Sequence, residues 1–98
     1  MLKKSYSKTG TICRVTFKLD AAVQAERVVL CGDFNEWQLD ANPMRKLKDG
    51  SFSTTISLES GEAYRFRYLV NDERWENDWD ADAYWTNDFG SEDSVVKV

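Results

Sequence analysis

The chain has 98 residues, of which 42% are hydrophobic and 31% are charged, and its formal net charge is −4. This length is enough for one domain with a single hydrophobic core. The sequence contains no histidine, which excludes histidine acid–base catalysis, Ser-His and Cys-His nucleophile pairs and most zinc sites.

The charge is unevenly distributed along the chain. Residues 1–70 carry 11 basic and 8 acidic side chains, whereas residues 71–98 carry 2 basic and 9 acidic ones. A nucleic-acid partner requires a dense basic surface, so the overall acidity argues against one. We expect the acidic region to be a solvated part of the domain that keeps it soluble.

The sequence predicts an N-terminal extension over residues 1–10 and a domain over residues 11–98. The first residues contain two lysines but no apolar segment behind them, so they do not resemble a secretory signal. No segment is long enough to span a membrane, and we expect a cytoplasmic protein without a membrane partner. Cys13 and Cys31 both fall in predicted strands, where reduced cysteines pack as small hydrophobic residues.

The first predicted strand runs from Thr11 to Leu19, because apolar and polar residues alternate along it. Residues 20–26 have no such period and predict a connection or a short helical turn. Residues 27–31 predict a second strand that is apolar on both faces, which is typical of a central strand.

A turn is predicted directly after this second strand. Gly32 can adopt positive φ, and Asp33 and Asn35 can hydrogen-bond to their own backbone. Trp37 follows between polar neighbours, without an apolar period that would bury it. We therefore expect Trp37 to be half-exposed on a turn at the edge of a sheet.

Further short strands are predicted in the second half of the chain. A short edge strand over 44–48 leads to a hairpin turn over 48–51 and a strictly alternating strand that begins at Phe52. In the next strand, residues 63–71, Arg65 and Arg67 share the face opposite the aromatic residues. Residues 76–90 show no period, and residues 94–98 predict a last strand. About six or seven short strands without a helix predict an all-β, immunoglobulin-like antiparallel β-sandwich.

Several motifs, taken in their order along the chain, resemble those of the family-48 carbohydrate-binding module. This module is the glycogen-binding domain found in isoamylases and glycogen-branching enzymes. The resemblance covers about residues 11–98, and it implies an early-set immunoglobulin-like fold. Its motifs are Gly32-Asp33-Phe34-Asn35-Glu36-Trp37, Met44, Gly50-Ser51-Phe52, Gly61-Glu62-Ala63-Tyr64, Phe66-Arg67-Tyr68 and the tail from Asn77-Asp78 through Asp80-Ala81-Asp82-Ala83-Tyr84 to Asn87, Phe89-Gly90 and Ser94-Val95-Val96.

The resemblance also implies a binding site for an α-1,4-glucan polysaccharide or a maltooligosaccharide. Trp37 and Trp75 correspond to the two aromatic residues that stack on sugar, and Arg67 stands where many relatives have lysine. Phe89 corresponds to an apolar residue that wedges against the glucan. Asp93 stands where an asparagine usually hydrogen-bonds the sugar, which is a departure from the family pattern.

Three further departures concern Trp79, Trp85 and Thr86. Trp79 and Thr86 stand near positions where relatives often carry prolines, and Trp85 is an aromatic residue that the family does not require. These tryptophans could extend the stacking platform, or they could pin a loop that has lost its prolines.

The chemistry of a sugar agrees with these implied residues. Glucose has an apolar C–H face, which suits tryptophan rings, and a rim of hydroxyl groups, which suits arginine and carboxylate side chains such as Arg67 and Asp93. We expect a non-catalytic α-glucan-binding module without a cofactor. The alternative is a protein–protein interaction module of the same fold, with an eroded sugar site at Asp93 and the added tryptophans as the partner contact.

Two other functions are disfavoured. Glycoside hydrolysis requires two carboxylates about 5 to 9.5 Å apart on a rigid frame, and here the carboxylates of the acidic region cluster in an unpatterned segment. Residues 78–82 are similar to the start of an EF-hand calcium loop, but Ala83 replaces the required glycine and Phe89 the bidentate glutamate.

Overall fold

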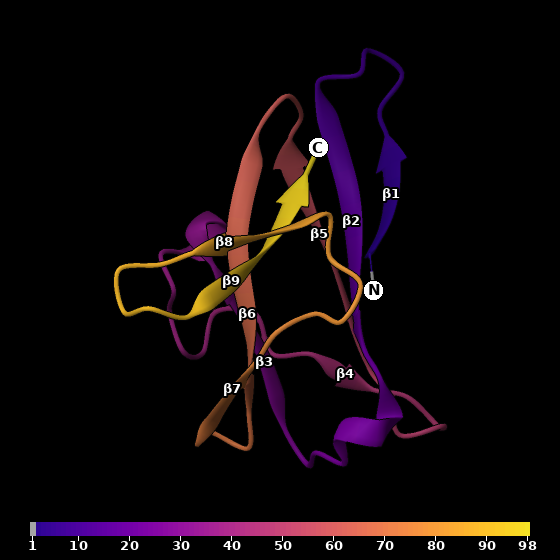
Figure 1. Cartoon of the computed structure of the whole chain (residues 1–98). Coiled ribbons are helices and arrows are strands. Elements are labelled where there is room, and N and C mark those ends of the chain that lie inside the picture. The colour runs from indigo at the N-terminus through magenta and orange to yellow at the C-terminus, as the bar shows by residue number, and fades with distance from the viewer. Residues whose placement is uncertain (1) are drawn as a thin grey trace.

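The computed structural model describes residues 2–98, which form nine β-strands and two single-turn 3₁₀ helices. The strands make two antiparallel sheets that pack face to face (Figure 1). The predicted all-β, immunoglobulin-like sandwich is therefore confirmed. Within residues 2–98, no helix is long and apolar enough to cross a membrane.

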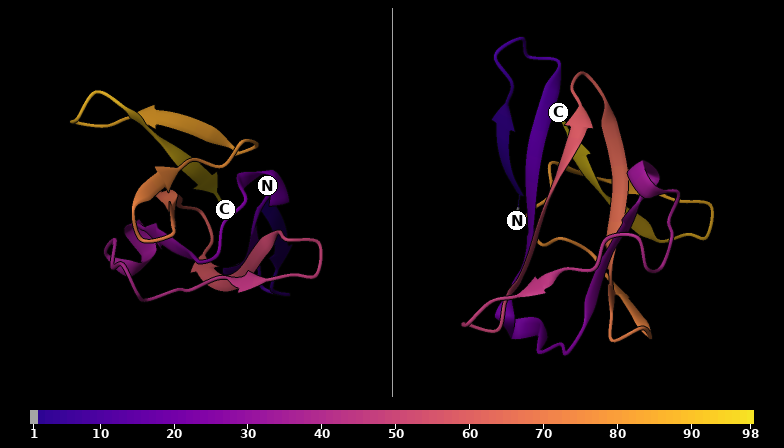
Figure 2. Two further views of the ribbon diagram at one scale, coloured as in Figure 1. Left: turned by 90° about the horizontal axis from the view of Figure 1, so that it is seen from below. Right: turned by 180° about the vertical axis from the view of Figure 1, so that it is seen from behind.

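The two sheets differ in size and in the order of their strands. The first sheet contains, in spatial order, β1 (Leu2–Tyr6), β2 (Ile12–Leu19), β5 (Phe52–Glu59) and β4 (Arg45–Lys46). The second sheet contains β3 (Val28–Gly32), β6 (Ala63–Val70), β9 (Glu92–Lys97) and β8 (Ala83–Thr86), and β7 (Arg74–Glu76) also pairs with β6. The helices are η1 (Ala21–Val23) and η2 (Asp33–Asn35), and Figure 2 shows the two layers from below and from behind.

The core lies between the two sheets and follows from the alternation of β2 and β6. Every second side chain of β2, from Cys13 to Leu19, is buried, as the sequence predicts. Phe66 of β6 faces Phe17 of β2, with ring centroids 5.0 Å apart in an edge-to-face arrangement. Because neighbours along a strand point to opposite faces, Arg65 and Arg67 stand on the outer face of β6.

The prediction that residues 27–31 form a central strand is wrong. In the structure, β6 is the one described strand that pairs with β3, which lies at the edge of the second sheet and makes an isolated bridge from Val29 to Pro43. The loop over residues 42–44 covers its free edge, since the Leu30 N–H donates to Asn42 O and the Met44 N–H donates to Val28 O, both over 2.8 Å. All residues of β3 are buried because this loop and the side chains outside the sheet shield an edge strand from water.

The strands β1 and β8 were not expected from the sequence. β1 pairs with β2 along its whole length, and β8 pairs with β9. Both are edge strands with largely exposed side chains, so they lack the clear hydrophobic alternation that identifies a half-buried strand. Cys13 and Cys31 are buried free thiols, which agrees with their predicted packing.

Candidate functional site

A groove of about 530 Å³ runs over the outer face of the second sheet. The turn after β3, the outer face of β6, the β6–β7 hairpin and the β8–β9 hairpin provide its walls. The structure brings all five predicted site residues together there. The lining residues are Trp37, Arg65, Arg67, Trp75, Asn87, Phe89, Ser91 and Asp93.

Trp37 and Trp75 form the aromatic wall of the groove. Their ring centroids lie 6.3 Å apart with an angle of 68° between the planes. Trp75 is 43% exposed, whereas Trp37 is half-buried and packs against the small apolar cluster of Val29, Cys31 and Leu69. Two flat surfaces that meet at an angle suit a curved ligand better than a planar one. The expectation of a half-exposed Trp37 on a turn is confirmed.

The turn that carries Trp37 is held by its own polar residues. Asn35 accepts a hydrogen bond from the Gly32 N–H and donates to Leu30 O and to Asn42 Oδ1. Asp33 accepts a bond from Trp37 Nε1 and one from the Arg65 N–H, each over 3.0 Å. Trp37 has a positive φ of 58°, which is uncommon for a bulky residue and which these bonds offset.

Gly32 lets the turn approach β6 closely. A Cβ atom at this position would lie 2.5 Å from the backbone oxygen of Arg65 and 2.8 Å from the Phe34 ring. The absence of a side chain therefore brings the Trp37 turn and the arginine strand together into one groove.

A carboxylate between two arginines forms the floor of the groove. Asp93 on β9 accepts a hydrogen bond from Arg67 Nε over 2.8 Å and one from Arg65 Nη1 over 3.2 Å. Its side chain is only 9% exposed. Arg67 Nη2 donates further to Ser91 Oγ and to Glu92 O, while its Nη1 has no hydrogen-bond partner within residues 2–98. Asp93 thus lies beneath the arginines, and Arg67 is held rigidly with one nitrogen left over.

The position of Arg67 follows from the topology of β6. β9 pairs with Ala63–Phe66, whereas β7 pairs with Tyr68–Val70. Because β3 occupies the other edge of β6 over residues 66–70, β7 and β9 follow one another on the same edge. Arg67 lies at the junction, between the strand that carries Trp75 and the strand that carries Asp93.

Phe89 projects from the tip of the β8–β9 hairpin and is 95% exposed. Asn87 closes this hairpin: its Oδ1 accepts the N–H groups of Phe89 and Ser91, and its Nδ2 donates to Ser91 Oγ and to Asp93 Oδ1. Gly90 has a φ of 80° and donates its N–H to Asn87 O. A fully exposed phenylalanine is therefore presented on a loop tied to the floor of the groove.

Three groove residues were not chosen as site residues from the sequence. Arg65 was noted only as an outward arginine, although its alternation with Arg67 was a usable signal. Asn87 and Ser91 lie in or beside the segment without a period, where only pairing of β8 with β9 brings them to the groove. Asn87 belongs to the tail motif of the family resemblance, but no local pattern in the sequence showed that Asn87 or Ser91 would reach the groove.

The two additional tryptophans occupy different places. Trp85 lies beside the groove, where the Arg65 guanidinium stands 5.2 Å from its ring centroid in a cation–π arrangement. Trp79 is 58% exposed in the loop between β7 and β8, outside the groove. Asp78, from the segment similar to a calcium loop, is buried and accepts a 2.6 Å hydrogen bond from the Tyr68 hydroxyl. Burial and the nearby Asp78 carboxylate raise the Tyr68 pKa well above its ordinary value of 10.0.

An immunoglobulin-like sandwich with an aromatic and arginine-lined groove on one sheet is an architecture that presents a surface for binding. The chain belongs to the family Carbohydrate-binding module 48 (Isoamylase N-terminal domain), which matches residues 6–85. Over 66 residues it is 36% identical to the 1,4-alpha-glucan branching enzyme GlgB of Aquifex aeolicus (strain VF5). This match covers 66% of the present chain and 10% of that enzyme, so the chain spans about a tenth of its relative's length.

Proposed function

We propose that this chain is a non-catalytic module that binds α-1,4-glucans such as glycogen or starch in the groove. The observation that carries the proposal is the convergence of Trp37, Trp75, Phe89 and Arg67 from four separate segments on one open surface. The family supports carbohydrate as the ligand class, and the name of the branching enzyme supports an α-1,4-glucan.

The groove offers complementary partners to both surfaces of a glucose unit. The rings of Trp37 and Trp75 face apolar C–H surfaces, and their angle follows the curvature of an α-1,4-linked chain. Arg67 Nη1 is a donor for a sugar hydroxyl, while Asp93 holds the guanidinium in place. In this arrangement Asp93 acts on the sugar through Arg67. This indirect role replaces the direct hydrogen bond to the sugar that the family resemblance implies for this position.

Binding without hydrolysis is the outcome that the groove supports. Hydrolysis of a glycosidic bond requires two available carboxyl groups, one of which acts as an acid. Within the described residues, the carboxylate that lines the groove is Asp93, and both of its oxygens accept hydrogen bonds from arginine. An exposed groove of this kind binds weakly, with about 4 to 7 kcal/mol of free energy, or about millimolar to ten micromolar.

Calorimetric titration of the full chain with maltoheptaose tests the proposal at 0.01 M and 0.1 M salt. A neutral glucan held by stacking should bind with affinities that agree within about a factor of two, although the Debye length falls from about 30 to about 10 Å. Absence of sugar binding at both salt concentrations would contradict the proposal and favour a protein-interaction module. The purified protein should release no reducing sugar from glycogen. Release that is abolished by replacing one carboxylate would contradict the proposal that the module is non-catalytic.

A further inference from the structure

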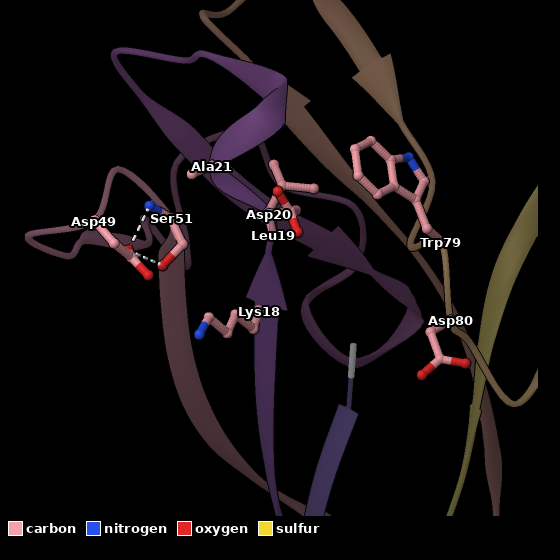
Figure 3. A pocket seen from close by; sticks show the side chains of 8 residues that line it. All are labelled: Lys18, Leu19, Asp20, Ala21, Asp49, Ser51, Trp79 and Asp80. Atoms are coloured by element: carbon pink, nitrogen blue, oxygen red, sulfur yellow. Dashed lines mark hydrogen bonds between the residues drawn. The ribbon is translucent and has the colours of Figure 1, made fainter.

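A second recess lies outside the groove, between the loop that joins β7 to β8 and the ends of β2 and β5 (Figure 3). Its volume is about 170 Å³, close to a third of that of the groove. We propose that this recess is a second carbohydrate-binding site, which takes a short stretch or an end of a glucan chain. Its lining residues are Lys18, Leu19, Asp20, Ala21, Asp49, Ser51, Trp79 and Asp80.

Trp79 is the aromatic wall of the recess, and its loop is anchored to the core. The buried Asp78 carboxylate accepts hydrogen bonds from the Tyr68 hydroxyl over 2.6 Å and from the Asp80 N–H over 2.8 Å. The Asp78 backbone N–H donates to Ser94 Oγ, and its carbonyl accepts from the Tyr84 hydroxyl. Trp79 itself donates from Nε1 to Glu76. A large indole is therefore held in contact with water by a firmly fixed loop, which is the arrangement of a stacking platform.

The opposite wall combines an apolar floor with polar groups of both kinds. Ala21 offers carbon surface above the buried Leu19, and Figure 3 shows Asp20, Asp49 and Lys18 around them, with Asp80 below Trp79. Asp20 is oriented by the Ala22 N–H, and Asp49 accepts hydrogen bonds from the Ser51 N–H and hydroxyl.

Hydroxyl groups match this polar set better than a cation does. A sugar hydroxyl both donates and accepts, so it can donate to the carboxylates and accept from the Lys18 ammonium. A cationic side chain would be attracted by the carboxylates and repelled by Lys18. With Trp79 available for the C–H face, a saccharide uses every kind of group that lines the recess.

The segments that line the two sites lie in different parts of the molecule. The β8–β9 loop and the turn after β3, which line the groove, lie at the left of Figure 1, whereas the end of β2, η1 and the β4–β5 turn lie at the lower right. Both further views keep these segments apart (Figure 2). One short oligosaccharide therefore cannot fill both sites, and the chain should bind two.

The proposal of a second site rests on the proposed function only for the class of its ligand. Nuclear magnetic resonance distinguishes binding in the recess from binding in the groove. We would titrate the full ¹⁵N-labelled chain with maltotriose and follow the indole signals of Trp37 and Trp79 and the backbone amides of Ser51 and Asp80. The same titration would use a groove variant, Trp75→Ala with Phe89→Ala, in which both replaced side chains are exposed. The expected result is a saturable shift at Trp79, Ser51 and Asp80 that persists in the groove variant.

Further variants identify the residues responsible. Trp79→Ala should weaken the maltotriose affinity reported by the amide signals of Ser51 and Asp80 about tenfold, and it should leave the affinity reported by Trp37 unchanged. Trp79→Phe should retain part of the affinity of the recess. Asp80→Ala should weaken maltotriose binding in the recess at least threefold. Glu62→Ala, a matched loss of one exposed charge elsewhere, should leave this binding unchanged.

Other outcomes overturn the second site. It fails if Trp79 does not respond at ten times the maltotriose concentration that saturates the groove, or if its response disappears in the groove variant. It also fails if an arginine-containing peptide shifts Trp79 and maltotriose does not. A response at Trp79 without one at Trp37 would support the recess and contradict the proposed groove, so the two failures are distinguishable.

Discussion

Arg67 and Asp93 form an ion pair of 2.8 Å at the floor of the groove, and Arg65 shares the same carboxylate. A carboxylate so little exposed is stable in its charged form only with such partners, and the partners in turn are fixed in position. The pair therefore links the stability of the sandwich to the geometry of the groove.

Removing the carboxylate should affect both properties. We expect Asp93→Ala to lower the free energy of unfolding by about 1 to 3 kcal/mol, because Arg65 and Arg67 lose a shared acceptor at a partly buried position. Maltoheptaose affinity should fall as well, since Arg67 becomes mobile. Urea unfolding and calorimetry measure the two effects. Relative to Asp93→Ala, Asp93→Asn should recover more of the affinity than of the stability, because an amide oxygen can still accept a hydrogen bond from Arg67 Nε. Equal maltoheptaose affinity of the wild type and both variants would show that Arg67 needs no such support.

The two groove tryptophans should differ in what their loss costs. Trp37→Ala and Trp75→Ala should each weaken glucan binding by about 1 to 3 kcal/mol, as aromatic anchors do. Only Trp37→Ala should also reduce stability measurably, because Trp37 packs on Val29, Cys31 and Leu69. Thermal unfolding beside calorimetry separates these contributions. Unaltered affinity in Trp75→Ala, with the fold intact, would remove Trp75 from the site.

Phe89 offers a cleaner test because its side chain lies almost entirely in solvent. At 95% exposure, Phe89→Ala should change the free energy of unfolding by no more than about 0.5 kcal/mol. Binding of maltoheptaose should nevertheless weaken. Asn87→Ala keeps the Phe89 ring but removes the side-chain hydrogen bonds that close the hairpin. This variant should bind maltoheptaose more weakly, with a larger entropic cost. Identical calorimetric profiles for wild type and Phe89→Ala would exclude a contact with the ligand.

Alkaline pH should destabilise the fold through Tyr68. Its pKa in the folded protein lies above the value of about 10 in the unfolded chain, so the folded state keeps a proton that the unfolded state loses. The stabilisation is fully present below pH 10 and is lost as the pH rises beyond it, by roughly 1 kcal/mol at about pH 10.5. Urea unfolding at pH 8 and at pH 10.5 measures this loss. Tyr68→Phe should be less stable at pH 8 but should show a smaller decrease between the two values.

The parts of the fold that sequence reasoning predicted are those with a strong local pattern. The alternation of residues 11–19 and 52–58 predicted the strands that face the core, and the glycine and polar residues after β3 predicted the Trp37 turn. β3 was misassigned as central because a covered edge strand has the same apolar composition as a central one. β8 lacked a pattern since hydrogen bonds to β9, rather than burial, hold it in the sheet.

The candidate site shows the same division. Trp37, Arg67, Trp75, Phe89 and Asp93 came from a family resemblance, and the structure brings them into one groove. The shared ion pair with Arg65 and the closure of the hairpin by Asn87 depend on contacts between residues more than twenty positions apart or on the pairing of β8 with β9. Such relationships have no signature in a single sequence.

The strand β1 has a practical consequence for where the domain can be shortened. The hydrophobic repeat begins near residue 11, so a fragment that starts there would contain every residue that lines either site. It would nevertheless leave the whole length of β2 as a bare edge, with its backbone N–H and C=O groups open to another chain, and it would lose the 2.7 Å pair between Lys4 and Asp82. We expect such a fragment to associate through β2, and preparations of the domain for sugar binding should therefore keep residues 2–6.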